Sequence, residues 1–139
     1  ILNENDSVVP RDLKVGDNDR LAAKVAQMIE ANYLIILTSV DGLYDRDPAD
    51  PDAVFISEIS DVSQHLTSTT GTSALGTGGM LTKMQAANMA QNAGCETIIA
   101  QGIIERPVSS VLNNERRHTK CLAFGVATSP LKVWLSNRL

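Results

Sequence analysis

The sequence has few cysteines, little concentrated positive charge and no long apolar run. Its two cysteines, Cys95 and Cys121, lack the spacing of a metal site, so we expect buried or idle thiols rather than a disulfide or metal ligands. The formal net charge is −4, and the only basic cluster is Arg116-Arg117-His118. This disfavours a nucleic-acid surface, because neutralising phosphates requires concentrated lysine and arginine. No apolar stretch approaches the length of a membrane-spanning helix and no secretory leader is recognisable, so we expect a cytoplasmic protein.

The chain also lacks an initial methionine. It begins at Ile1-Leu2, which resembles the end of a buried strand, and a terminus in mid-strand would leave an unpaired sheet edge. We therefore expect that an N-terminal part is absent, with a processed terminus as the alternative. The 139 residues suffice for one domain with a modest core.

Apolar periodicity predicts two amphipathic helices, over about 19–31 and about 80–93. Gly94 follows the second helix and suits a left-handed C-terminal cap. A short helix is expected over 108–112, and residues 57–66 are weakly helical.

Short apolar runs rich in β-branched residues predict strands that are buried on both faces. They occur at 34–37 and 97–100, while the last strand is expected at 121–124 and a short edge strand at 54–56. Strands that alternate with helices are typical of an α/β layered fold with a mainly parallel sheet.

The most informative segment is the glycine-rich turn at 76–83, which runs directly into the helix over 80–93. Adjacent glycines allow a ligand to approach the backbone closely, and the helix start offers unpaired N–H groups to an anion. A cation in the first turn opposes the helix dipole, so Lys83 is poorly placed for helix stability and well placed for phosphate. An ordinary helix start with a solvated lysine is the alternative.

Acidic and amide side chains crowd the first 19 residues. The carboxylates are Glu4, Asp6, Asp12, Asp17 and Asp19, and the amides are Asn3, Asn5 and Asn18. Neighbouring carboxylates repel one another unless a cation lies among them, such as Mg²⁺, a substrate ammonium or a lysine of the site itself. Solvated capping and turn residues are the alternative interpretation.

Three polar segments fall at predicted strand ends or helix starts: residues 3–6 with 16–19, residues 38–44, and residues 76–83. Ligands of such sheets bind beyond the carboxyl ends of the strands, so these segments predict one composite active site. Phosphoryl transfer requires charge neutralisation and in-line alignment of two oxygens, which this set can supply. The residues thus favour a kinase that acts on a small, amino-bearing acceptor.

The motifs as a set resemble the glutamate 5-kinases of the amino acid kinase family. They are Asn3-Glu4-Asn5-Asp6, Lys14-Val15-Gly16-Asp17-Asn18-Asp19-Arg20-Leu21, Asp41-Gly42-Leu43-Tyr44 with Asp47-Pro48, and Gly76-Thr77-Gly78-Gly79-Met80 with Thr82-Lys83. The resemblance implies a three-layer sandwich and transfer of the ATP γ-phosphoryl group to the side-chain carboxylate of L-glutamate, the first step of proline synthesis. It also implies Mg²⁺ bridging the phosphates, with no protein metal ligand assigned.

The resemblance also implies roles for particular residues. Asp6 and Asn18 would bind glutamate, and Asn3 would shape that pocket. Asp19 would organise the catalytic lysines, and Lys83 would stabilise charge on the transferring phosphoryl group. The implied ATP-binding residues are Thr38, Ser39, Thr77, Gly78, Gly79, Met80, Leu81, Thr82 and Lys83.

The same comparison implies that residues 1–139 are the C-terminal portion of a single kinase domain, without an accessory C-terminal domain. The family's N-terminal strand, its glycine-rich loop and a second catalytic lysine are missing, so we expect the isolated chain to be inactive. Oligomer formation and feedback inhibition by proline are further implications. The alternatives are another amino acid kinase, acting on acetylglutamate, aspartate or a nucleoside monophosphate, or a non-catalytic remnant.

Overall fold

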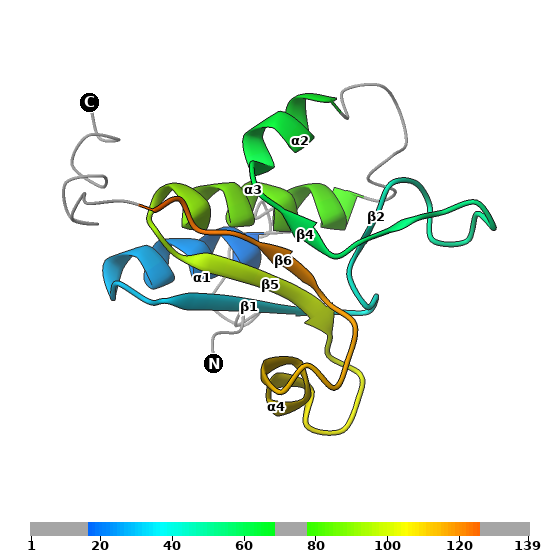
Figure 1. Ribbon diagram of the computed structural model, residues 1–139. Coiled ribbons are helices and arrows are strands. Elements are labelled where there is room, and N and C mark those ends of the chain that lie inside the picture. Colours follow the sequence, from blue (N-terminus) through cyan, green and yellow to red (C-terminus); the bar gives the residue numbers. More distant parts are fainter. Residues whose placement is uncertain (1–16, 69–77, 126–139) are drawn as a thin grey trace, which may run out of the picture.

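The computed structural model describes residues 17–68 and 78–125 (Figure 1). Four strands form one sheet in the order β1-β5-β6-β4. They are β1 (Tyr33–Thr38), β5 (Glu96–Gln101), β6 (Thr119–Cys121) and β4 (Glu58–Ile59). β1 runs parallel to β5 and β4 runs parallel to β6, whereas β5 and β6 are antiparallel. The expected α/β fold with a mainly parallel sheet is confirmed.

Two helices, α1 (Asp17–Met28) and α3 (Gly78–Asn92), lie side by side on one face of the sheet (Figure 1). Their contact surfaces are lined by small residues, which bring the helix axes close to the sheet and to each other. These are Ala23 and Ala26 of α1 and Ala86, Ala87 and Ala90 of α3. With Met84, Ile36 and Ile99 they form the larger hydrophobic core.

The other face of the sheet is covered by the short helix α4 (Pro107–Leu112). Val111 of α4 packs with Ile98 and Ala100 of β5, and Ile35 of β1 lies against them. Ile99 faces the larger core while its two neighbours face α4, because successive side chains of a strand alternate between the faces. The central strand is therefore buried on both sides, and the fold has three layers.

The carboxyl end of α3 is closed as the sequence predicts. Gly94 adopts a positive φ of 77°, which a residue without a side chain adopts without strain. Its N–H donates to the Gln91 carbonyl (3.1 Å), and the Cys95 N–H donates to the Ala90 carbonyl (2.9 Å). This pair of hydrogen bonds is a Schellman cap.

Two sequence predictions are corrected. The last strand occupies Thr119–Cys121 rather than 121–124. Beyond Cys121 the Leu122 N–H still donates to the Ile59 carbonyl of β4 (3.0 Å), but the Leu122 carbonyl accepts from the Gln91 side-chain amide (2.6 Å) and the Phe124 N–H donates to the Gln91 carbonyl (3.3 Å), so α3 becomes a partner of the chain here. The segment 57–66 is only partly helical, since β4 precedes α2 (Val62–Ser68).

A small hairpin projects from the sheet after β1. Its strands β2 (Leu43–Tyr44) and β3 (Phe55–Ile56) are antiparallel, which confirms the short strand expected at 54–56. Turns at Asp47 and Asp50 connect them. Within the two described ranges, no helix is long and apolar enough to cross a membrane.

Candidate active site

The starts of α1 and α3 lie at the carboxyl ends of β1 and β5. Each helix leads through a short connection into the parallel strand that follows it, so each runs opposite to that strand (Figure 1). Three groups of predicted site residues therefore lie toward the same edge of the sheet: Asn18 and Asp19 on α1, Thr38 at the end of β1 with Ser39 after it, and Gly78 to Lys83 on α3. Asn3, Asp6 and Thr77 lie outside the described residues.

Asp19 and Lys83 form an ion pair between the two helix starts. The Lys83 Nζ lies 3.1 Å from the Asp19 Oδ2, and the two side chains are only 16% and 15% exposed. The Thr82 hydroxyl is 3.1 Å from the same carboxylate oxygen and 2.8 Å from the Gly79 carbonyl. Lys83 is the sixth residue of α3 and lies in its second turn rather than in the first turn that the sequence predicts, and the pair with Asp19 fixes where its ammonium lies.

A second contact ties the same helix ends together. The Arg20 guanidinium donates to the Gln85 side-chain oxygen (2.7 Å), two residues further along α3 than Lys83. Two cross-helix contacts from adjacent α1 residues therefore fix the position of the α3 start relative to α1.

Thr38 and Ser39 are bonded through their carbonyls to the segment that ends β5. The Gly102 N–H donates to the Thr38 carbonyl (2.8 Å), and the Gln101 side-chain amide donates to the Ser39 carbonyl (3.3 Å). A Cβ atom on Gly102 would lie 3.0 Å from the Leu37 Cβ, so glycine permits this close approach. The ends of the two parallel strands are thereby tied together.

The remaining predicted nucleotide residues are divided between core and surface. Met80 packs against the larger core, whereas Leu81 is 41% exposed. A Cβ atom on Gly79 would meet none of the described residues within 4 Å, so these residues leave the backbone open to a ligand on this side. Gly78 is the first residue of α3.

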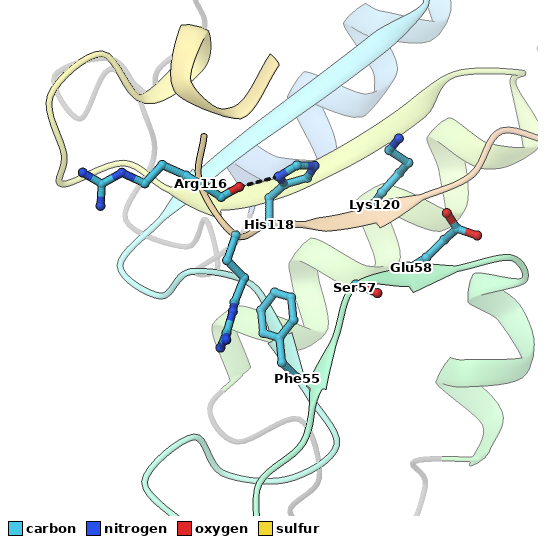
Figure 2. A pocket seen from close by; sticks show the side chains of 7 residues that line it. Phe55, Ser57, Glu58, Arg116, His118 and Lys120 are labelled. Carbon is cyan, nitrogen blue, oxygen red and sulfur yellow. Dashed lines mark hydrogen bonds between the residues drawn. The ribbon is translucent and has the colours of Figure 1, made fainter. Parts of the chain in front are cut away.

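Two cavities lie beside the basic segment that enters β6, and neither is lined by Asp19 or Lys83. One of about 370 Å³ is lined by Phe55, Ser57, Glu58, Arg116, Arg117, His118 and Lys120 (Figure 2). The other, of about 180 Å³, is lined by Asp41, Gln101, Ile104, Val111, Arg116 and Arg117. Arg117 also pairs weakly with Asp41, with 3.9 Å between the guanidinium and the carboxylate.

The two cysteines are free and buried, as the sequence predicts. Burial raises the pKa of Cys95 to about 11 and that of Cys121 to about 12. A thiolate is the reactive form, so both thiols are unreactive at neutral pH.

Two buried polar residues were not recognised as anchors from the sequence. Thr119 bonds to both strands of the hairpin, and Gln91 bonds α3 to the segments around β4 and β6. Gln91 could have been found, because it falls on the apolar side of the predicted helix, where an amide requires partners. Thr119 lies before the predicted strand, and its neighbours in sequence give no comparable signal.

The sequence profile of the amino acid kinase family matches residues 1–101. The chain therefore belongs to the amino acid kinase family. Glutamate 5-kinase of Thermoanaerobacter sp. (strain X514) is 42% identical over 98% of this chain and 37% of its own length. Glutamate 5-kinase of Sphingopyxis alaskensis is 44% identical over the whole chain and 37% of its own length. The chain thus spans little more than a third of these relatives.

Solved structures of the same fold include carbamate kinase from Giardia lamblia bound to AMP-PNP. It superposes with a TM-score of 0.61 and 24% identity, covering 78% of this chain and 32% of that one. UMP kinase from Ureaplasma parvum gives a TM-score of 0.55 and 22% identity over 76% and 41% of the two chains. These likenesses support the three-layer architecture.

Proposed function

We propose that this chain supplies the nucleotide-binding part of a glutamate 5-kinase, which transfers the ATP γ-phosphoryl group to the L-glutamate side-chain carboxylate. The observation that carries the proposal is the Asp19–Lys83 pair, which fixes an ammonium in the second turn of a glycine-led helix. The similarity to glutamate 5-kinases over the length of the chain supports the choice of acceptor.

In this proposal Lys83 stabilises charge on the transferring phosphoryl oxygens, and Asp19 positions Lys83. A preorganised cation at the developing charge stabilises the transition state more than the ground state. Thr38, Ser39 and residues 77–83 bind ATP around the strand ends. Asn18, with Asn3 and Asp6, binds glutamate.

The described residues alone do not fit a metal held by the protein. Within 17–68 and 78–125, no group of three or more histidine, cysteine, aspartate or glutamate side chains could hold an ion. Asp19, the carboxylate between the helix starts, is engaged by Lys83. We therefore propose Mg²⁺ only as the companion of the ATP phosphates and derive no step through it.

Because the chain spans 37% of its relatives, activity is a property of the complete protein. Residues 1–139 are proposed to be one portion of a single kinase domain, inactive in isolation. Cytoplasmic location, oligomer formation and inhibition by proline remain predictions.

The acceptor is tested by incubating the complete protein with ATP, hydroxylamine and one acceptor at a time. Glutamate is expected to give a hydroxamate, while acetylglutamate and aspartate give little. Rapid reaction of either alternative, or of a nucleoside monophosphate in a coupled assay, would replace the proposed substrate. No turnover of any acceptor would favour a non-catalytic remnant.

A further inference from the structure

The hairpin β2–β3 is too small to hold its position by itself. Only two residues of each strand are paired, with Leu43 opposite Ile56 and Tyr44 opposite Phe55. An isolated two-stranded hairpin is marginally stable in water, so contacts with the rest of the fold must fix it. Its position matters because only residues 39–42 separate it from the end of β1.

The contact at its base is the side chain of Thr119, the first residue of β6. The hydroxyl is completely buried, accepts a hydrogen bond from the Leu43 N–H (2.8 Å) and donates one to the Ile56 carbonyl (2.7 Å). Leu43 and Ile56 are directly opposite each other, so one hydroxyl joins both strands of the hairpin to the main sheet.

This contact requires a residue without a side chain at Gly42, next to Leu43. A Cβ atom on Gly42 would lie 2.6 Å from the Thr119 Oγ1 and 2.8 Å from the Phe55 ring. Both distances are shorter than atoms tolerate, so a side chain at Gly42 would force the hairpin away from β6.

A weaker contact closes the exposed side of the hairpin. The Arg117 guanidinium lies 4.7 Å from the centroid of the Phe55 ring and 3.5 Å from the Tyr44 hydroxyl. The Tyr44 hydroxyl donates to the Asp41 carboxylate, and the Tyr44 ring meets Phe55 edge-on at 5.2 Å. Figure 2 shows Phe55 facing the segment that enters β6. Arg117 is well exposed, so solvent weakens its contribution.

We propose that Thr119 is a positioning residue of the nucleotide site. It anchors the base of the hairpin and thereby fixes residues 39–42. The Thr38 carbonyl secures one end of this segment through Gly102, and the Leu43 N–H secures the other through Thr119. The role at the nucleotide rests on the proposed function, since Thr38 and Ser39 are its expected contacts.

The chain offers a matched control on the adjacent strand. Thr97 of β5 is also completely buried, but its hydroxyl has no hydrogen-bond partner in the part of the chain that the structure describes. Thr119→Val and Thr97→Val both replace a hydroxyl by a methyl group of similar size. Only Thr119→Val leaves a buried N–H and a partly buried carbonyl without their partner. Thr119→Ser keeps the hydroxyl.

The test combines amide hydrogen exchange and nucleotide affinity in the complete protein. In Thr119→Val the Leu43 amide is expected to exchange about tenfold faster or more, and the KM for ATP to rise about tenfold while kcat changes less. Thr119→Ser should restore both values, and Thr97→Val should leave them unchanged. Arg117→Ala removes the weaker contact at an exposed site and should speed the exchange of the Leu43 amide by a smaller factor. This variant keeps the hairpin contacts testable if Thr119→Val does not fold.

The two readouts separate the possible failures. Unchanged exchange at Leu43 in Thr119→Val and in Arg117→Ala would contradict the anchor itself. Faster exchange with unchanged ATP affinity would contradict the positioning role. If the wild-type protein binds no ATP, both the proposed function and the role of Thr119 at the nucleotide are wrong. The exchange rate of the Leu43 amide would still show whether Thr119 anchors the hairpin.

Discussion

The two ends of α3 are held in opposite ways. At its start, Lys83 forms a partly exposed ion pair with Asp19. Near its end, the fully buried Gln91 uses both protons and the oxygen of a neutral amide. An incoming phosphate can compete for the ammonium at the first end, whereas the amide at the second has no free group to offer. We therefore expect the start to govern activity and the end to govern stability.

The largest loss of stability is expected for Gln91→Leu. It leaves the Ser60 and Leu122 carbonyls and the Val62 N–H without their side-chain partner, and we expect unfolding to require about 2–4 kcal/mol less free energy. Asn92→Leu makes the same chemical change at an exposed position and should cost less than about 0.5 kcal/mol. Urea unfolding measures both. Equal effects would show that the amide network does not hold α3.

Two glycines, one at each end of α3, are expected to respond to substitution with stability changes of different sign. Gly94→Ala forces a side chain into a positive φ and should destabilise the fold by about 1–2 kcal/mol. Gly79→Ala, where a Cβ would meet none of the described residues within 4 Å, should be neutral or stabilise the fold by up to about 1 kcal/mol. Thermal melts of the two variants under one buffer condition test the difference in sign. A clear loss in Gly79→Ala would mean that the α3 start is more tightly packed than the structure indicates.

A smaller change in stability is expected for Asp19→Asn. The pair is mostly buried, but the asparagine keeps an oxygen that can accept a hydrogen bond from the Lys83 ammonium, so the free energy of unfolding should fall by only about 1 kcal/mol, and less at high salt. Glu30→Gln changes an exposed carboxylate on the turn after α1 and should have no measurable effect. Denaturant titrations at two salt concentrations distinguish them. A salt-independent loss of several kcal/mol would make the pair a structural element.

Titration of the two cysteines is expected to change the free energy of unfolding least near neutral pH. Their folded-state pKa values, about 11 and about 12, lie above the ordinary value of 9.0. Above pH 9.0 the thiols of the unfolded chain lose their protons, while those of the folded chain keep theirs up to about pH 11 and about pH 12. The stability that the buried thiols contribute is therefore fully present below pH 9 and falls as the pH rises. Cys121→Ala should flatten this decline relative to the wild type. An unchanged slope in pH-dependent melts would contradict the assignment.

Elements with a strong local pattern were predictable from the sequence. β1, β5 and α3 combine continuous or periodic apolar residues with clear ends, and Gly94 marks a cap that depends on its own backbone. The sheet order placed both helix starts at one edge of the sheet, and the resemblance to the glutamate 5-kinases implied that Asp19 organises the lysines there.

Anchors between distant segments were not predictable. Thr119 lies 76 residues from Leu43, and only the assembled sheet brings its hydroxyl to the hairpin. The boundaries of β6 were misjudged for the same reason, since Gln91 of α3 bonds to the Leu122 carbonyl and to the Phe124 N–H after the strand ends. Asn3, Asp6 and Thr77 lie outside the described residues, and the roles of all the predicted site residues stay predictions.

The role proposed for Lys83 is tested most directly by the turnover rate of Lys83→Met in the complete protein. Lys24→Met, which changes an exposed lysine of α1, is the matched control. We expect kcat for glutamyl hydroxamate formation to fall about 100-fold to 1,000-fold in Lys83→Met, with nearly unchanged stability, and Lys24→Met to behave like the wild type. Equal rates in the two variants would contradict the claim that the start of α3 stabilises the transferring phosphoryl group.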